Sequence, residues 1–223
     1  MPYITCVSRT TENQQLKRLI LHIYADYDKR LGAYKPRRHR HQKEKGDCAN
    51  HLKQKFSQNA SNLVWVSDFT YIKAGGKWYF LCVIIDLFSR KVIAWHVSAK
   101  LDVNLVMTTF KKAYESRNAP YGLMFQSDRG SQYTAFAFRQ LLDSLNVVQS
   151  FSKKGYPFDN AVCESFFRYL KKEETDRRTY AALSGLKLSV FSYIEGYYNS
   201  KRPHGSLGYL TPNEMEAAYW GQK

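Results

Sequence analysis

The sequence predicts an α/β domain in which helices pack against a mixed five-stranded sheet. Three apolar segments joined by short turns come first, and such short connections favour antiparallel strands. Farther along the chain, strand-like segments alternate with amphipathic helices, which is typical of parallel pairing. The 223 residues, 44% of them hydrophobic, suffice for one sizeable core and a smaller appendage.

The predicted strands are apolar segments rich in β-branched and aromatic residues. The first three are LVWVSDFTYI at 63–72, KWYFLCVIID at 77–86 and KVIAWHV at 91–97. An AGG turn at 74–76 separates the first two, so we expect a meander. Two further strands are expected in LMFQSD at 123–128 and VVQSFS at 147–152.

Helices are expected between and after the last strands. Residues 103–117 place Leu105, Phe110 and Ala113 on one apolar face. The remaining helices are expected at 134–145, at about 159–173 and at about 179–198. The resulting element order is β-β-β-α-β-α-β-α.

The N-terminal part of the chain differs in composition from the rest. Residues 12–30 show helical periodicity, and the run LGAYKPRRHRHQKEKG at 31–46 is strongly basic. Such a run is usually a solvated linker, and on DNA it would contact phosphates. We divide the chain into an N-terminal helix and basic linker at 1–60, an α/β core at 61–175 and a helical C-terminal segment at 176–223.

The charge balance favours a polyanionic partner. Thirty-four basic residues outnumber 19 acidic ones, so nucleic acid is the expected partner, although a net charge of +15 can also simply aid solubility. The four scattered cysteines form no disulfide pattern, which fits a reducing cytoplasm. His39, His41, Cys48 and His51 match no common zinc spacing. No signal peptide or membrane-spanning segment is expected.

Three acidic residues stand where packing alone would not favour a charge. Asp68 interrupts an apolar strand, Asp128 closes a strand, and Glu164 lies within a helix. Each by itself also fits a cap, a turn or a solvated surface. If the three converge, a cation must offset their repulsion, and oxygen ligands select Mg²⁺ or Mn²⁺. Asp86 also ends an apolar strand, and we interpret it as a turn-stabilising acid.

The helix around Glu164 has two distinct faces. Asn160 and Arg168 lie about 40° to either side of Glu164, and Lys171 returns to within about 20°. A cation beside a metal-binding acid is well placed to hold a phosphate, whereas the alternative is a Glu164–Arg168 surface ion pair. The apolar residues of the opposite face are Val162, Phe166, Tyr169 and Leu170.

The segments around these acids resemble those of a known family. Thirty-five residues separate Asp128 from Glu164, and Lys171 follows seven positions later, as in the DD(35)E plus K/R signature of retroviral integrases and related transposases. Five segments are similar, in order, to the blocks of the insertion-sequence-three family transposase, second reading frame. They are WVSDFTYI, VIIDLFSRKVIAW, QSDRGSQY, SFSKKGYPFDNAVCESFFRYLKKE and YYNSKRPHGSLGYLTPNEME, and the resemblance covers about residues 61–217.

The resemblance implies a ribonuclease-H-like core whose catalytic metal ligands are Asp68, Asp128 and Glu164, holding two Mg²⁺ or Mn²⁺ ions. It implies hydrolysis of a phosphodiester at an element end and attack of the freed 3′-OH on another strand. The implied partners are element-end and target DNA, further copies of the chain on DNA, and a separate or fused upstream-frame DNA-binding protein. We expect a bacterial cytoplasmic protein associated with the nucleoid, with no membrane partner.

Several residues near the acids are candidate DNA contacts. Lys171 matches the basic position of the signature, and the loop before the Glu164 helix carries basic and aromatic side chains that can grip phosphates or stack on bases. A solvated loop is the alternative. The candidate DNA-binding residues are Lys171, Arg168, Asn160, Lys153, Lys154 and Tyr156.

Other matched residues are expected to have structural roles. Asp159 is interpreted as the N-cap of the Glu164 helix. Asn199, Arg202 and His204 are expected to pack and hydrogen-bond within the C-terminal block. At the front, KPRRHRHQKEKG follows LGAYK directly, without the recognition helix that the family has there. Two alternatives stay open, a nuclease of the same fold without strand transfer and a catalytically silent DNA-binding remnant.

Overall fold

A computed structural model describes residues 48–118, 120–153 and 157–221. The chain from residue 47 onward forms one compact unit. The helix expected at 12–30, the basic run at 31–46 and the loop residues Lys154 and Tyr156 lie outside the described residues. All five expected strands lie within them.

The fold is built on five strands, β1 (Val64–Ala74), β2 (Lys77–Asp86), β3 (Val92–Ser98), β4 (Met124–Ser127) and β5 (Val148–Phe151). They form one sheet in the order β3-β2-β1-β4-β5. β1 pairs antiparallel with β2, and β2 with β3, whereas β1 pairs parallel with β4, and β4 with β5. The predicted meander and the predicted parallel pairing are both confirmed.

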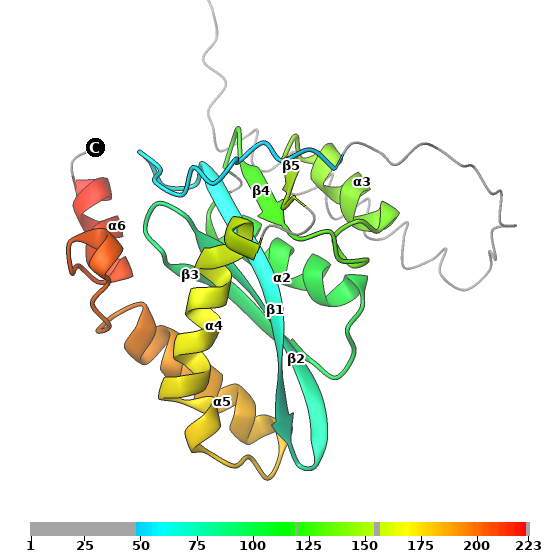
Figure 1. Cartoon of the computed structure of the whole chain (residues 1–223), viewed down its shortest axis with the longest axis vertical. Helices are drawn as coiled ribbons and strands as arrows, with labels where there is room; N and C mark the ends of the chain where they lie inside the picture. The colour runs from blue at the N-terminus through cyan, green and yellow to red at the C-terminus, as the bar shows by residue number, and fades with distance from the viewer. Residues whose placement is uncertain (1–47, 119, 154–156, 222–223) are drawn as a thin grey trace, which may run out of the picture. The chain divides into compact units, whose positions relative to one another are not determined.

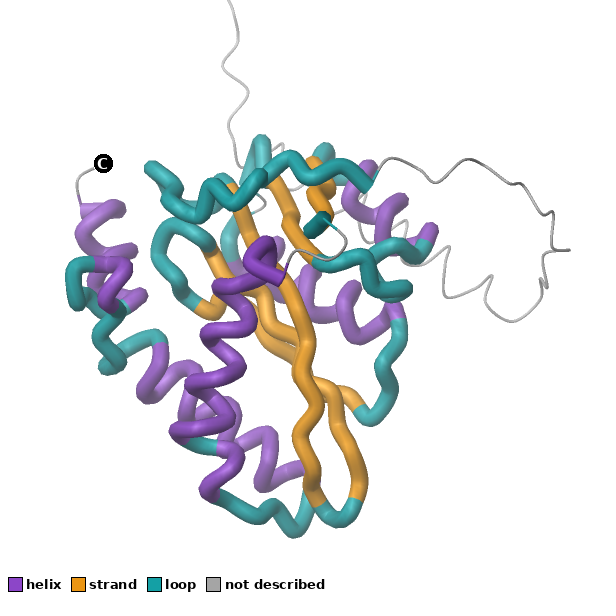
Figure 2. Tube along the Cα trace, in the orientation of Figure 1, coloured by secondary structure: helices purple, strands orange, loops and turns teal. Residues whose placement is uncertain are grey.

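The helices are α2 (Val103–Ser116), α3 (Phe136–Ser144), α4 (Ala161–Glu173), α5 (Leu183–Tyr193) and α6 (Pro212–Gly221). A 3-10 turn, η1 (Pro157–Asn160), leads into α4, and α5 continues into a π-helical turn, η3 (Ile194–Tyr198). Figure 2 shows these helices around the strands. Within the described part of the chain, no helix is long and apolar enough to cross a membrane.

Side chains alternate along β1 between two separate hydrophobic cores. Val64, Val66 and Ile72 lie in the core that α4 and α5 cover. Trp65 lies in the core that α2 and α3 cover on the other face. By this period of two, Asp68 belongs to the face covered by α4, which runs alongside β1 (Figure 1).

The C-terminal segment packs on the edge strand β3. The buried Asn199 side chain accepts from Val92 N and donates to Val92 O, each at 3.0 Å. On α6, Glu216 pairs with Lys91 at 3.1 Å and with Arg117 at 2.6 Å. These contacts confirm the structural role expected for Asn199 and attach the tail to the sheet.

Candidate active site

Asp68 and Asp128 are brought together by the register of two neighbouring parallel strands. β1 and β4 align Val66 with Gln126. Continuing this register by two residues places Asp128 level with Asp68, just beyond the end of β4. Asp68 is half-buried, and its Oδ1 accepts the Phe69 backbone N–H at 2.8 Å. The sheet itself therefore sets the spacing of these two acids.

A tight turn orients the Asp128 carboxylate. The Gly130 backbone N–H donates to Asp128 Oδ1 at 2.9 Å. A Cβ at Gly130 would lie only 2.9 Å from that same oxygen and 3.2 Å from Gln132 Oε1. A larger residue at this position would therefore have to displace the Asp128 carboxylate.

A buried tyrosine ties the two acid-bearing segments together on the opposite face of the sheet. The Tyr133 hydroxyl lies 2.9 Å from Ser67 Oγ, and the Ser67 hydroxyl donates to Val83 O at 2.9 Å. The Tyr133 ring also stacks on Phe69, with centroids 6.0 Å apart. The neighbours of Asp68 on β1 are thus bound to the loop that follows Asp128.

Ser67, Gly130 and Tyr133 were not singled out from the sequence as supports of the site. The sequence does carry a signal for Ser67, because it is a polar residue next to Asp68 in an otherwise apolar strand. Gly130 and Tyr133 lie in the QSDRGSQY segment, but their partners become visible only in three dimensions.

Glu164 lies in the first turn of α4 and is exposed. Four residues anchor this helix in the core, Cys163, Phe166, Phe167 and Leu170. Val162 is partly buried and packs against the same core, as expected. Tyr169 is only partly buried, and the Arg202 guanidinium stacks on its ring, 3.7 Å from the centroid.

The charges of the three acids act on one another. The pKa of Asp68 is raised from 3.8 to about 7, chiefly by burial and to a smaller extent by the carboxylates of Asp128 and Glu164, whereas the Phe69 N–H and the Asn160 side chain act to lower it. Burial also raises the pKa of Cys163, and Asp68, Glu164 and Asp128 all add to that effect. Asp128 and Glu164 are therefore close enough to Asp68 for their charges to act on it.

The three carboxylates are neighbours but do not form a ready-made metal cage. Within residues 48–118, 120–153 and 157–221, no group of three or more His, Cys, Asp or Glu side chains is arranged to hold a metal ion. Asp68, Asp128 and Glu164 therefore interact through their charges but do not form a closed coordination shell. The donor set still suits a hard divalent cation, because it contains only carboxylate oxygens.

The alternative of an ion pair between Glu164 and Arg168 is not observed in the described part of the chain. Arg168 is exposed, and its guanidinium donates to Ser165 Oγ at 3.4 Å. The Lys171 ammonium group lies 5.1 Å from the ring centroid of Tyr71 on β1. Both cations thus lie on the same helix as Glu164 without neutralising it.

Asp159 is not the helix cap that the sequence suggested. Its buried carboxylate accepts from Asn50 Nδ2, Gln54 Nε2 and the Lys153 backbone N–H. Asn160 occupies the N-cap position of α4, and its side chain makes no capping hydrogen bond. Asp86, by contrast, confirms its expected role, because it is buried and accepts from the backbone N–H groups of Phe88 and Asn62.

Arg202 and His204 have the packing roles expected for them. Arg202 Nε lies 3.1 Å from Glu173 Oε2, and the His204 ring packs edge-on against Tyr198. Burial and nearby guanidinium groups lower the pKa of His204 to about 4, so the imidazole is neutral near pH 7.

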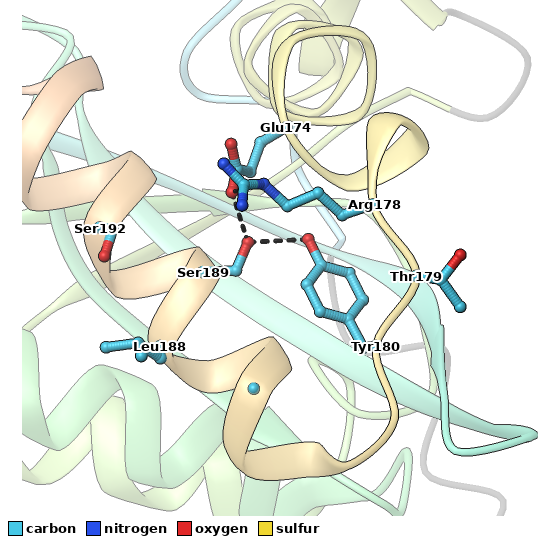
Figure 3. Close-up of a pocket in the computed structure, with 8 residues that line it drawn as sticks. Glu174, Arg178, Thr179, Tyr180, Leu188, Ser189 and Ser192 are labelled. Atoms are coloured by element: carbon cyan, nitrogen blue, oxygen red, sulfur yellow. Dashed lines mark hydrogen bonds and ion pairs between the residues drawn. The ribbon is translucent and has the colours of Figure 1, made fainter.

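A separate pocket lies at the other end of α4. Glu174 is the C-cap of this helix and Glu164 lies in its first turn, so these two residues are about 15 Å apart along the axis. The Ser189 hydroxyl joins Tyr180 and Glu174 across the pocket, and Arg178 pairs with Glu174 at 2.7 Å (Figure 3). None of the predicted site residues lines it.

Comparison with known protein families and curated proteins identifies the class of this domain. Models of the integrase core domain match residues 58–157 and 145–212. The transposase for insertion sequence element IS904 of Lactococcus lactis is 37% identical over 167 residues, which are 75% of this chain and 66% of that protein. Transposase InsF for insertion sequence IS3A of Escherichia coli is 35% identical over 75% of this chain and 58% of its own length. The chain thus spans less than two thirds of the curated relatives it matches.

Solved structures agree on the fold. The simian T-cell lymphotropic virus intasome, solved with PP2A regulatory subunit B56 gamma, contains a chain with a TM-score of 0.58 and 17% identity, covering 75% of this chain and 57% of its own. The catalytic core domain of BIV integrase has a TM-score of 0.52 and 20% identity, and the match covers 73% of this chain and 99% of that domain. The dimeric HTLV-2 integrase core in complex with magnesium has a TM-score of 0.50 and 17% identity, and the match covers 70% of this chain and 97% of that core.

These likenesses confirm the ribonuclease-H-like fold class and the resemblance to insertion-sequence-three transposases. The chain belongs to the integrase core family.

Proposed function

We propose that this chain is the catalytic part of a DNA transposase that cleaves the ends of an insertion sequence and joins them to another strand. The observation that carries this proposal is the arrangement of the acids. By the strand register, Asp68 on β1 is level with Asp128 just beyond the end of β4, and Glu164 lies in the first turn of α4, which packs over the same face. Their negative charges repel one another, and a shared cation would offset that repulsion.

The proposed cofactor is Mg²⁺ or Mn²⁺, bound as two ions by Asp68, Asp128 and Glu164. The HTLV-2 integrase core of similar fold was solved in complex with magnesium. Bound divalent ions would lower the pKa of a water or a 3′-OH and stabilise charge on the phosphate. The task of the chain is then to hold these acids at fixed positions and to align the DNA.

DNA is the proposed substrate and partner. Exposed Arg168 and Lys153 and half-buried Lys171 lie close in sequence to Glu164, on a chain with a net charge of +15. Asn160 and the loop residues Lys154 and Tyr156 complete the proposed DNA-binding set. Transposition joins two DNA ends, so we propose that several copies of the chain assemble on DNA in the bacterial cytoplasm, with or without an upstream-frame protein.

The proposed catalytic core spans about residues 61–175, and residues 176–223 complete it on the side of β3. The buried contacts of Asn199 and Glu216 with the sheet support including the tail in the folded domain. Residues 1–60 form the proposed N-terminal helix and linker.

The proposal is tested by incubating the purified chain with labelled DNA that carries the element ends, in the presence of Mn²⁺. We expect cleaved and joined products from the wild type. Glu164→Gln and Asp128→Asn should each lose roughly a thousandfold or more in rate while still retarding DNA. Asp143→Asn, which changes an exposed acid on α3, is the matched control and should retain activity.

The outcomes separate the alternatives. Equal product from the wild type and Glu164→Gln would contradict the proposed mechanism. Hydrolysis without joining would identify a nuclease of the same fold. DNA retardation that Asp128→Asn leaves unchanged, with no Mn²⁺-dependent nicking by the wild type, would identify a DNA-binding remnant.

A further inference from the structure

The segment at 48–54 is held firmly against the sheet although it belongs to no helix or strand. The Phe151 backbone N–H donates to Ala49 O at 2.9 Å, which extends the pairing at the edge of β5. Ser150 Oγ accepts from the backbone N–H groups of His51 and Leu52. Leu52 is only 3% exposed and lies in the core that α4 covers. The segment passes the N-terminal end of α4 (Figure 1).

This segment supplies two of the hydrogen bonds that satisfy the Asp159 carboxylate. Asn50 Nδ2 donates to Asp159 Oδ2 and Gln54 Nε2 donates to Oδ1, each at 2.8 Å. The Lys153 backbone N–H donates to Oδ2 at 2.7 Å. Asp159 is only 2% exposed, and a carboxylate so buried is costly unless hydrogen bonds of this kind stabilise it. The carboxylate therefore holds the 48–54 segment and the start of η1 together.

The residue that follows Asp159 reaches the proposed catalytic acids. The Asn160 side chain lies near enough to the Asp68 carboxylate to lower the pKa of that group. Asn160 Oδ1 is buried and has no hydrogen-bond partner among the described residues. η1 contains both Asp159 and Asn160 and leads directly into the turn of α4 that carries Glu164. Displacing Asp159 would therefore move Asn160 and Glu164 relative to Asp68.

We propose that Asp159 is a positioning residue, which the 48–54 segment holds so that Asn160 and Glu164 face Asp68. The expected effect of Asp159 on the rate of DNA cleavage rests on the proposed function. Asp159 itself touches no reacting group. Partners of this kind, one step removed from the ligands, typically affect activity by about tenfold to a hundredfold when they are removed.

The test compares Asp159→Asn with a reciprocal swap in the full chain. An asparagine at 159 presents an N–H₂ group to donors and loses one of the three hydrogen bonds or more. We expect single-turnover cleavage at saturating DNA to fall by about tenfold to a hundredfold while the Kd for DNA stays unchanged. Combining Asp159→Asn with Asn50→Asp restores a donor–acceptor pair between the two positions and should recover much of the rate.

Amide hydrogen exchange gives a readout that needs no catalysis. In Asp159→Asn, the amides of 159–164 should exchange at least several-fold faster than in the wild type, and the swap should slow them again. Asn50→Ala combined with Gln54→Ala removes two donors and leaves Asp159 in place, so it tests the same contact if Asp159→Asn does not fold. Gln58→Ala is the matched control, because Gln58 lies just after the 48–54 segment and its side chain donates to the nearby Lys55 carbonyl rather than to Asp159.

The results separate this inference from the proposed function. Unchanged exchange at 159–164 in both the Asp159 variant and the double-alanine variant would overturn the inference, as would full cleavage activity in both. A wild type that cuts no DNA would instead refute the proposed function, and the exchange measurements would still decide whether the 48–54 segment positions η1.

Discussion

The two sides of the candidate site differ in how firmly they are held. On the sheet side, the ladder between β1 and β4, the Gly130 turn and the buried Tyr133 fix Asp68 and Asp128. On the helix side, Glu164 is exposed and begins a helix that follows a 3-10 turn anchored by Asp159. The sheet side is therefore preorganised, whereas the helix side depends on contacts from distant parts of the chain.

This difference gives a physical reason why the acids are electrostatic neighbours without forming a metal cage. Asp68 lies within the paired part of β1, and Asp128 lies just beyond the end of β4, where the Gly130 N–H holds its carboxylate. Glu164 is exposed on α4, and repulsion from Asp68 and Asp128 opposes its approach. A divalent cation would remove that repulsion, so binding of metal and closure of the helix side are expected to be coupled.

Gly130→Ala tests how strongly the sheet side depends on its turn. The added Cβ would lie 2.9 Å from Asp128 Oδ1 and must displace that carboxylate. We expect cleavage to fall by about tenfold to a hundredfold with DNA affinity retained. Gly185→Ala on α5, where a Cβ meets nothing within 4 Å, is the control. Wild-type activity in Gly130→Ala would show that the position of Asp128 tolerates movement.

Asp68→Asn tests the electrostatic coupling through the pH dependence of folding in metal-free buffer. The pKa of Asp68 is raised from 3.8 to about 7, so the folded state binds the proton more tightly. The wild type should therefore lose stability as pH rises from about 4 through 7, and it should not regain it above 7. Asp68→Asn has no ionisable group at this position, so its stability does not fall in this way as pH rises. At pH 8 its free energy of unfolding should exceed that of the wild type by about 1–2 kcal/mol, after allowance for solvent screening.

The measurement is urea unfolding of both proteins at several pH values in the presence of a chelator. At pH 4 the two free energies of unfolding should differ least, because the Asp68 carboxyl is protonated in the folded state and still partly protonated in the unfolded state, where its pKa is 3.8. Adding Mn²⁺ at pH 8 should stabilise the wild type and not Asp68→Asn. A difference that does not change between pH 4 and pH 8 would refute the raised pKa of Asp68.

Lys171→Gln tests whether α4 contacts DNA, and we expect it to have the smallest effect of these variants. Lys171 lies on the helix that carries Glu164 and beside the Tyr71 ring. Removing one phosphate contact should weaken DNA binding by roughly threefold to tenfold. It should also reduce the slope of the logarithm of the binding constant against the logarithm of the salt concentration by about one. Lys172→Gln is the matched control, because its side chain points about 100° away. Equal salt slopes for both variants would argue against the contact.

The strands and helices were predictable because their signals are local. Apolar segments bounded by turns located all five strands, and periodicity located α2, α3, α4 and α5 to within a few residues. The helix α6 at Pro212–Gly221 was missed, since no helix was expected after about residue 198. The acids at 68 and 128 also stood out locally, since each breaks or ends an apolar strand. Asp159 shows the limit of such reasoning. An acid before a helix looks like a cap, and its two side-chain donors lie 109 and 105 residues earlier in the chain.

The sequence by itself determined the element order, the positive charge and the identity of the acids, because these depend on composition and on neighbours along the chain. Only the tertiary structure decided how the acids are held. The parallel register sets Asp68 beside Asp128, Tyr133 cross-links their segments, and the 48–54 segment anchors the start of the Glu164 helix. These are long-range contacts between buried polar groups, and their geometry exists only once the chain has folded.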